Sequence, residues 1–255
     1  MSQTLKRLAE RALGSLGYTV ARSEDAGGAL PPDFDPDDVS LYSRVQPYTL
    51  TSPERVYVLS KAVQYVAGHD IPGAIVECGV WKGGSMMAVA LTLQALGKQD
   101  RDLYLFDTFE GMPAPTDRDV SVDGKPAMVE FEQTRINSDS SLWCNAPVEA
   151  VKLVLEQTGY DKSRVHLIKG KVEDTIPNHA PRTIALLRLD TDWYESTRHE
   201  LEHLFPRLST GGVIIIDDYG HWQGARRATD EYLAANGIRL LLNRVDYTAR
   251  IGVKV

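Results

Sequence analysis

The chain has 255 residues, of which 43% are hydrophobic and 25% are charged, and its net charge is −7. A chain of this length and composition folds as one large domain or as a core domain with a cap, and it is not disordered as a whole. The acidic balance argues against a nucleic-acid partner. The only two cysteines, Cys78 and Cys144, do not make a disulfide framework, which fits a cytoplasmic location.

The N-terminus predicts no membrane anchor. No apolar run approaches the ~20 residues that a membrane-spanning helix needs, and the first residues lack the apolar stretch of a secretory signal. Apolar side chains at helical spacing predict a surface helix that packs on the domain or on a sister subunit of a homodimer or higher homo-oligomer, with weak membrane-surface contact as the alternative. These side chains are Leu5, Leu8, Ala12, Leu13 and Leu16.

Residues 24–39 hold several Gly, Pro and Asp residues and predict an irregular linker. A helix is then predicted to begin at Pro53, with Ser52 as its N-cap. One face of that helix carries the apolar side chains Val56, Leu59, Val63 and Val66.

From Ala74 onward predicted strands and helices alternate, which indicates βαβ units and a mostly parallel sheet with helices on both faces. The last two strands follow each other without a helix and predict an antiparallel hairpin. The predicted strands are Ala74–Glu77, Asp102–Phe106, Val165–Lys169, Thr183–Leu189, Val213–Ile216, Arg239–Leu242 and Ala249–Val253. The predicted helices are Gly84–Leu96, Val148–Thr158, Glu195–Phe205 and Ala225–Ala235.

One connection is too long for a compact α/β unit. Residues 111–145 are rich in Pro, Gly and Asp and show little periodicity. A connection of this length is usually a functional lid or a disordered segment. Because it leaves the sheet at the end where cofactors bind, we expect a lid that orders with ligands.

The turn after the first predicted strand contains Gly79, Gly83 and Gly84. Glycine permits strained turns and close approach of the backbone to a ligand. The spacing differs from the dinucleotide G-x-G-x-x-G pattern. Glu77, two residues before the first glycine, would repel a pyrophosphate but tolerate a sulfonium group. This turn therefore favours S-adenosylmethionine over NAD.

Acids also follow the second and third strands. Asp107 stands where doubly wound folds place an acid on the ribose hydroxyls, although a strand-end cap is the alternative. Glu173 and Asp174 follow the third strand, a usual place for groups that recognise adenine, and a helix N-cap explains Asp174 equally well.

The fourth and fifth strands end in pairs of aspartates, Asp190 with Asp192 and Asp217 with Asp218. Neighbouring strands lie ~4.8 Å apart, so acids at their ends would converge in one coordination sphere. Ligation by carboxylates alone suits Mg²⁺ or Ca²⁺, with Mn²⁺ possible. A glycine turn for a cofactor and an acid cluster for a metal together predict a metal-assisted group-transfer enzyme.

Other polar and aromatic residues near these strand ends carry less information. Trp193 and Tyr194 could contact substrate, but an aromatic residue at a helix start is as often packing. His221 could line the pocket, and Arg226 with Arg227 is interpreted as a solvated helix face.

With these motifs in place, the chain resembles the macrocin O-methyltransferase (TylF-type) family, the Mg²⁺-dependent enzymes that methylate sugar hydroxyls of antibiotics. The resemblance implies a Rossmann-like class I methyltransferase fold with a seven-stranded sheet. The matching stretches are Pro47–Arg55, Val76–Gly84, Leu105–Pro113, Gly170–Thr175 and Leu189–Thr197. On this basis residues 1–55 are predicted to form an N-terminal helix, linker and cap, and residues 56–255 the methyltransferase domain with a lid insertion at 111–145.

The resemblance also implies roles for individual residues. Asp192 is expected to be the general base. The expected metal ligands are Asp190, Asp217 and Asp218. The expected cofactor contacts are Thr51, Glu77, Gly79, Ser85, Asp107, Thr108, Glu173 and Asp174.

The predicted reaction is methyl transfer from S-adenosylmethionine to a hydroxyl of a small sugar-bearing acceptor. Methylation of a catechol-like or other small diol, and a silent subunit that only binds S-adenosylmethionine, remain the alternatives.

Overall fold

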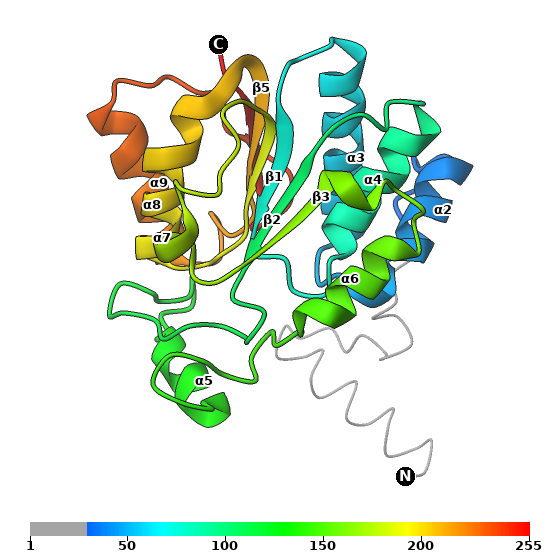
Figure 1. The fold of residues 1–255 in the computed structure, drawn as a ribbon. Coiled ribbons are helices and arrows are strands. Elements are labelled where there is room, and N and C mark those ends of the chain that lie inside the picture. Colours follow the sequence, from blue (N-terminus) through cyan, green and yellow to red (C-terminus); the bar gives the residue numbers. More distant parts are fainter. Residues whose placement is uncertain (1–29) are drawn as a thin grey trace, which may run out of the picture. The chain divides into compact units, whose positions relative to one another are not determined.

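The computed structural model describes residues 30–255 (Figure 1). Two compact units divide the chain after Val39, and the structure describes residues 30–39 of the first. The predicted N-terminal helix lies outside the described residues. The predicted linker gives way to helix α2 (Pro36–Val45).

A seven-stranded sheet forms the centre of the second unit, in the order β3-β2-β1-β4-β5-β7-β6. The pairs among β1 to β5 are parallel, and β7 runs antiparallel to both β5 and β6. This architecture confirms the predicted fold, including its C-terminal hairpin. The strands are β1 (Ala74–Cys78), β2 (Leu103–Asp107), β3 (Val165–Lys169), β4 (Ile184–Leu189), β5 (Leu208–Ile216), β6 (Asn243–Arg244) and β7 (Arg250–Val253).

One strand prediction was wrong. The segment Arg239–Leu242 is not a strand, and β6 begins only at Asn243. Leu240 and Leu242 pack against the core while Leu241 is exposed. The alternating burial produces a strand-like pattern without ladder hydrogen bonds to β7.

Helices cover both faces of the sheet (Figure 1). One apolar cluster joins the sheet to α3, α4 and α6, and a second joins its other face to α7 and α8. The alternating side chains of Ile75 and Val76 belong to different clusters, as the two-residue period of a strand requires. The helices of the second unit are α3 (Pro53–Gly68), α4 (Gly84–Ala95), α5 (Ala127–Thr134), α6 (Val148–Glu156), α7 (Val172–Thr175), α8 (Tyr194–Leu204) and α9 (Gln223–Ala235). The 3₁₀ turns are η1 (Gln46–Tyr48), η2 (Lys162–Arg164) and η3 (Phe205–Arg207).

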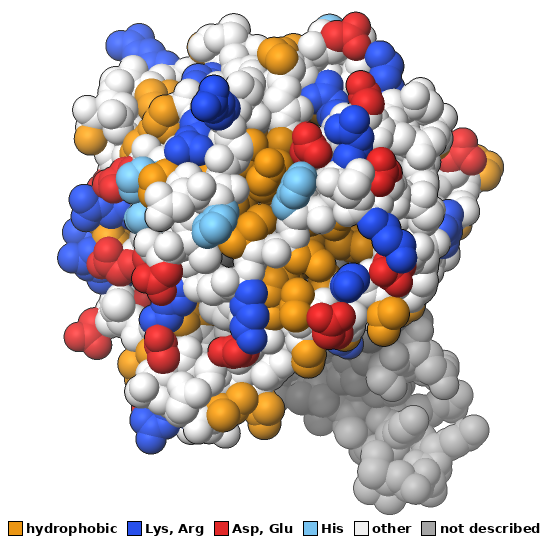
Figure 2. Space-filling model, viewed as in Figure 1, with side chains coloured by type: hydrophobic (Ala, Val, Ile, Leu, Met, Phe, Trp, Pro, Cys, Tyr) orange, Lys and Arg blue, Asp and Glu red, His pale blue; other side chains and the backbone are white. Residues whose placement is uncertain are grey.

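Edge strand β3 is covered less than the central strands. All five of its residues are partly buried or exposed, whereas all of β1 and β4 is buried. Figure 2 shows apolar side chains among charged ones on the face of the molecule turned toward the viewer.

The predicted start of helix α3 is confirmed. The Ser52 side chain accepts a hydrogen bond of 3.2 Å from the backbone N–H of Arg55, and Pro53 is the first helical residue. This cap sets the direction in which α3 begins, at Pro53.

Segment 111–145 is folded against the rest of the unit. It contains helix α5, which the sequence did not predict because only Ala127 and Phe131 of this short helix are buried. Asp119 is buried and accepts a hydrogen bond of 2.8 Å from the backbone N–H of Tyr194. The role of this segment as a lid stays a prediction.

Among residues 30–255, no helix is long and apolar enough to span a bilayer.

Candidate active site

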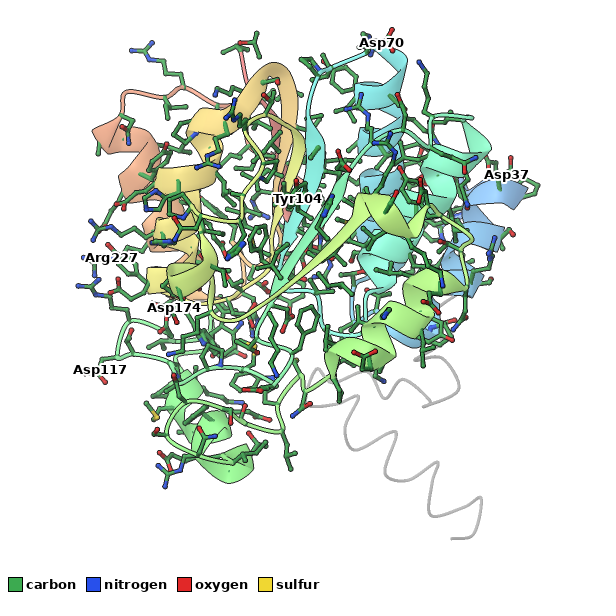
Figure 3. The ribbon with its side chains drawn as sticks, viewed as in Figure 1. Asp37, Asp70, Tyr104, Asp117, Asp174 and Arg227 are labelled. Carbon is green, nitrogen blue, oxygen red and sulfur yellow. The ribbon has the colours of Figure 1, made fainter. Side chains whose placement is uncertain are left out.

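A cavity of about 430 Å³ lies at the carboxyl ends of the parallel strands. Its walls come from the turns after β1 to β5, from residues 48–55 and from segment 111–145. In open α/β sheets this end of the strands is where ligands bind. Figure 3 shows the side chains around the strand ends.

Gly79, the first glycine of the turn after β1, lies where this turn packs closely against the turn after β4. Gly79 has a φ of +83°, and a Cβ at this position would overlap the backbone carbonyl oxygen of Asp190. The glycine therefore allows the turns after β1 and β4 to touch. Gly79 also lines the cavity, as the sequence predicted.

Asp107 shapes the glycine turn from the neighbouring strand. Its Oδ2 accepts hydrogen bonds from the backbone N–H groups of Val80 and Trp81, at 2.6 and 3.0 Å. Its Oδ1 accepts one from the N–H of Phe109 at 2.7 Å. Asp107 is thus a strand-end cap. Because it also lines the cavity and carboxylate oxygens have further lone pairs, the ribose contact stays open to it.

The other residues that were predicted to contact the cofactor do not all line the cavity. Thr51, Ser85, Thr108 and Glu173 line the cavity. Asp174, labelled in Figure 3, is exposed on α7 and lies outside the described cavity wall.

Glu77 is also outside the described cavity wall. It is 1% exposed, and its Oε1 accepts a hydrogen bond of 2.6 Å from Nη1 of Arg188. Burial raises the pKa of Glu77 to about 7, against the opposing effect of Arg188. The structure therefore gives Glu77 an ion pair inside the sheet, and the predicted cofactor contact has no support from its position.

Three aspartates converge beside the glycine turn. Asp190, Asp192 and Asp218 each offer a carboxylate oxygen, and these oxygens lie within 4.8 Å of one another. Oδ2 of Asp218 is buried and finds no hydrogen-bond partner among residues 30–255. Burial raises the pKa of Asp192 to about 7 and holds the pKa values of Asp190 and Asp218 well above the usual range for aspartate.

These carboxylates fit a hard divalent cation. Like charges this close in a partly buried site oppose one another's ionisation, and a cation removes that cost. The unpaired oxygen of Asp218 is a ligand atom without another partner in the described chain. An oxygen-only donor set matches Mg²⁺, Ca²⁺ or Mn²⁺.

Asp217 is placed differently from the predicted ligand set. It is 2% exposed, its Oδ1 lies 2.9 Å from Nη2 of Arg188, and its Oδ2 pairs with Arg55. The structure thus groups Asp192, rather than Asp217, with Asp190 and Asp218. Each Asp217 oxygen keeps a further lone pair, so its role as a ligand and the role of Asp192 as base both stay predictions.

Two arginines of the site, Arg188 and Arg55, were not predicted from the sequence. Arg188 was hidden inside the apolar run Ala185–Leu189, although an arginine there needs a partner. Its register partner on β1 is Glu77, which was the available signal. Arg55 is placed by the first turn of α3 and also approaches Oδ2 of Asp246 at 3.1 Å.

Aromatic rings form part of the opposite wall. Trp143, Trp193 and Trp222 pack with ring centroids 5.1 to 6.0 Å apart. Trp143 and Trp222 line the cavity, whereas Trp193 is buried and donates its indole N–H to the carbonyl oxygen of Pro113 at 3.2 Å. For Trp193 the packing interpretation holds.

The structure also places the histidine and the two arginines that the sequence singled out. His221 lines the cavity, with its Nδ1 3.3 Å from the Tyr247 hydroxyl. Arg226 and Arg227 lie on the exposed face of α9, which confirms the solvated-face interpretation; Arg227 is labelled in Figure 3.

Known proteins share this fold. The O-methyltransferase NovP has a structure that aligns with a TM-score of 0.71 at 30% identity, covering 82% of each chain. CalS11, a calicheamicin methyltransferase, aligns with a TM-score of 0.61 over 99% of this chain and 93% of its own, and at 22% identity it shows the fold alone. The protein is therefore a class I methyltransferase in fold.

Sequence comparison narrows this class. The family model of the macrocin O-methyltransferases (TylF) matches residues 36–251. An 8-demethyl-8-(2,3-dimethoxy-alpha-L-rhamnosyl)-tetracenomycin-C 4'-O-methyltransferase of Streptomyces olivaceus is 34% identical over 220 residues, 85% of this chain and 80% of that protein. A mycinamicin III 3''-O-methyltransferase of Micromonospora griseorubida is 31% identical over 191 residues, 75% of this chain and 72% of that protein. The chain belongs to the macrocin O-methyltransferase family and is an S-adenosylmethionine-dependent O-methyltransferase.

Proposed function

We propose that this enzyme methylates a hydroxyl of a sugar in a glycosylated natural product or glycan, in a reaction that depends on a divalent cation, with Mg²⁺ the first choice. The observation that carries the proposal is the convergence of Asp190, Asp192 and Asp218 on the cavity that the glycine turn also lines. The named activities of the relatives, such as a rhamnosyl-tetracenomycin 4'-O-methyltransferase, support a sugar acceptor.

The donor would occupy the side of the cavity next to β1 and β2. Asp107 is positioned to accept hydrogen bonds from ribose hydroxyls while it holds the glycine turn. Glu173 in the turn after β3 is the residue available for the adenine end, and Thr51, Ser85 and Thr108 complete this wall.

The acceptor would lie next to the aspartates. Asp190 and Asp218, with Asp217 beside them, would hold the cation. A bound divalent cation supplies Lewis acidity, which lowers the pKa of an acceptor hydroxyl. Asp192, whose carboxylate lies beside those of Asp190 and Asp218, would accept the hydroxyl proton.

The backbone supports a special role for Asp192. Its φ is +69°, in the left-handed region that a non-glycine residue adopts at a cost of about 1–3 kcal/mol. Such strain is retained where the surrounding structure requires a particular side-chain direction. The positive φ of Asp192 is therefore consistent with a functional role for its loop.

Methyl transfer is an in-line displacement, in which the acceptor oxygen forms a bond to the methyl carbon as the bond from that carbon to sulfur breaks. The enzyme's main task is alignment, which can contribute several kcal/mol. Trp143, Trp222 and Met112 provide an apolar wall that would keep water away from the reacting atoms.

Further features of the protein are proposed from the same reasoning. Residues 56–255 would form the methyltransferase domain, with 111–145 as its lid. Cys78 and Cys144 are both free thiols in the described chain, which supports a reducing, cytoplasmic setting. We also propose a homodimer or higher homo-oligomer.

The test is turnover with trideuteromethyl S-adenosylmethionine and Mg²⁺ against two acceptor pools, natural-product glycosides and catechols. Mass spectrometry should find the label on a sugar oxygen of a glycoside. Label on catechols alone would replace the sugar acceptor with an aromatic diol. Binding of S-adenosylhomocysteine without turnover on either pool would favour a silent binding subunit.

A further inference from the structure

Arg188 is a buried charged side chain that the proposed chemistry does not use. It is 4% exposed in the middle of β4. Its Nη1 lies 2.6 Å from Oε1 of Glu77 and 2.7 Å from Oδ2 of Asp190, and its Nη2 lies 2.9 Å from Oδ1 of Asp217. One guanidinium therefore forms ion pairs with three carboxylates. The contact with Glu77 is also a hydrogen bond, whereas Nη2 and Oδ1 of Asp217 form an ion pair without hydrogen-bond geometry.

The sheet register brings these groups together. Arg188 pairs with Glu77 on β1 and with Ile215 on β5. Asp190 and Asp217 each follow two residues after a member of that row, and residues two apart in a strand share a face. The contact is therefore fixed by the backbone of three adjacent strands and not by a mobile surface side chain.

The chemistry of the guanidinium suits this position. Buried carboxylates are costly without a counter-charge. Arginine offers several N–H donors in a rigid planar fork, so it constrains the direction of each carboxylate that it binds. Lysine carries the same charge as a compact point and does not impose that geometry.

We propose that Arg188 is a positioning residue for the cation site, which rests on the cation-dependent function proposed above. It holds one oxygen of Asp190 and one of Asp217, so that the remaining lone pairs of these aspartates keep a fixed direction toward the cation. Its contribution is orientation, in addition to charge.

The first test is the substitution Arg188→Lys, read by direct Mn²⁺ binding in electron paramagnetic resonance, without donor or acceptor. Loss of a partner that orients metal ligands typically weakens metal binding by about 10–100-fold, and we expect that range here. S-adenosylhomocysteine affinity should be unchanged, and excess cation should restore kcat. The matched control is Arg207→Lys, because Arg207 also donates to three oxygens, the carbonyls of Pro177, Ala180 and Pro181, but before the start of β5. This control should lower stability without changing Mn²⁺ affinity.

A double variant separates orientation from charge and covers the case in which Arg188→Lys does not fold. Glu77→Gln with Arg188→Gln leaves the net charge of the group unchanged and can keep an amide–amide hydrogen bond. Weakened Mn²⁺ binding in this variant supports the proposal, whereas wild-type affinity overturns it. If the wild-type protein itself binds no Mn²⁺, the proposed cation site fails. If wild-type and Arg188→Lys proteins bind Mn²⁺ equally, only the role of Arg188 fails.

Discussion

Replacing Asp192 with asparagine tests the division of labour between two aspartates that stand two residues apart. Asparagine keeps the shape and a polar oxygen but cannot accept the acceptor's proton. We expect Asp192→Asn to fold, to bind S-adenosylhomocysteine as the wild type does, and to lose turnover. Excess Mg²⁺ should not restore it.

The expected loss of rate in Asp192→Asn follows from the proposed role of Asp192 as the general base. Loss of one general base costs ~10²–10⁴ in rate, or about 2.7–5.4 kcal/mol of transition-state free energy. The carboxylate oxygen of Asp192 lies within 4.8 Å of those of the other two aspartates, so some loss of metal affinity should accompany the substitution.

The matched variant is Asp190→Asn, which removes a charged ligand and a partner of Arg188. The assay is steady-state methylation over a range of Mg²⁺ concentrations, with Mn²⁺ affinity measured separately. Asp190→Asn should raise the Mg²⁺ concentration needed for half-maximal rate and recover much of its kcat at saturation. Rescue of Asp192→Asn by cation, without rescue of Asp190→Asn, would reverse the two roles. A loss of less than tenfold in both variants would exclude the carboxylate mechanism.

Three further outcomes are expected. Asp107→Ala should weaken S-adenosylhomocysteine binding by roughly 1.5–3 kcal/mol in calorimetry, because a hydrogen bond to a charged group is lost. The control is the substitution of the exposed Asp174 by alanine. An unchanged affinity in Asp107→Ala would mean that another residue contacts the ribose. Mg²⁺ affinity should rise with pH, because burial raises the pKa values of Asp190 and Asp218, and that of the neighbouring Asp192 to about 7, so protons must leave before the cation binds. Calorimetry in buffers of different ionisation enthalpy should detect the released protons, and pH-independent binding would argue against a cation site at Asp190 and Asp218. Limited proteolysis should cut residues 111–145 more slowly with Mg²⁺ and S-adenosylhomocysteine bound, and equal rates would argue against a lid.

The regular part of the fold was predictable because its signals are local. β3 runs from Val165 to Lys169 as predicted, since a short apolar run between turn residues specifies a strand. The N-cap at Ser52 likewise follows from neighbouring residues. Helix α5 escaped prediction because its stability comes from tertiary packing of few buried residues rather than from a periodic face.

The aspartates of the site could be predicted from the sequence, but their interaction partners could not. Strand-end position identified the aspartates, because every parallel strand ends at the same edge. It could not show that Asp217 forms ion pairs with Arg55 and Arg188, whereas Asp218 lies with Asp190 and Asp192. Adjacent residues after a strand point in different directions, and their partners come from distant segments. The ion pair of Glu77 could not be predicted for the same reason, since its partner Arg188 is 111 residues away.

Removal of the metal from the purified enzyme is the most direct measurement of cation-dependent methyl transfer. After exhaustive chelation, methylation of a glycoside acceptor should stop while S-adenosylhomocysteine still binds with nearly unchanged affinity, and added Mg²⁺ should restore the rate. Turnover that survives exhaustive chelation would contradict this mechanism and would make the convergent carboxylates of Asp190, Asp192 and Asp218 structural acids.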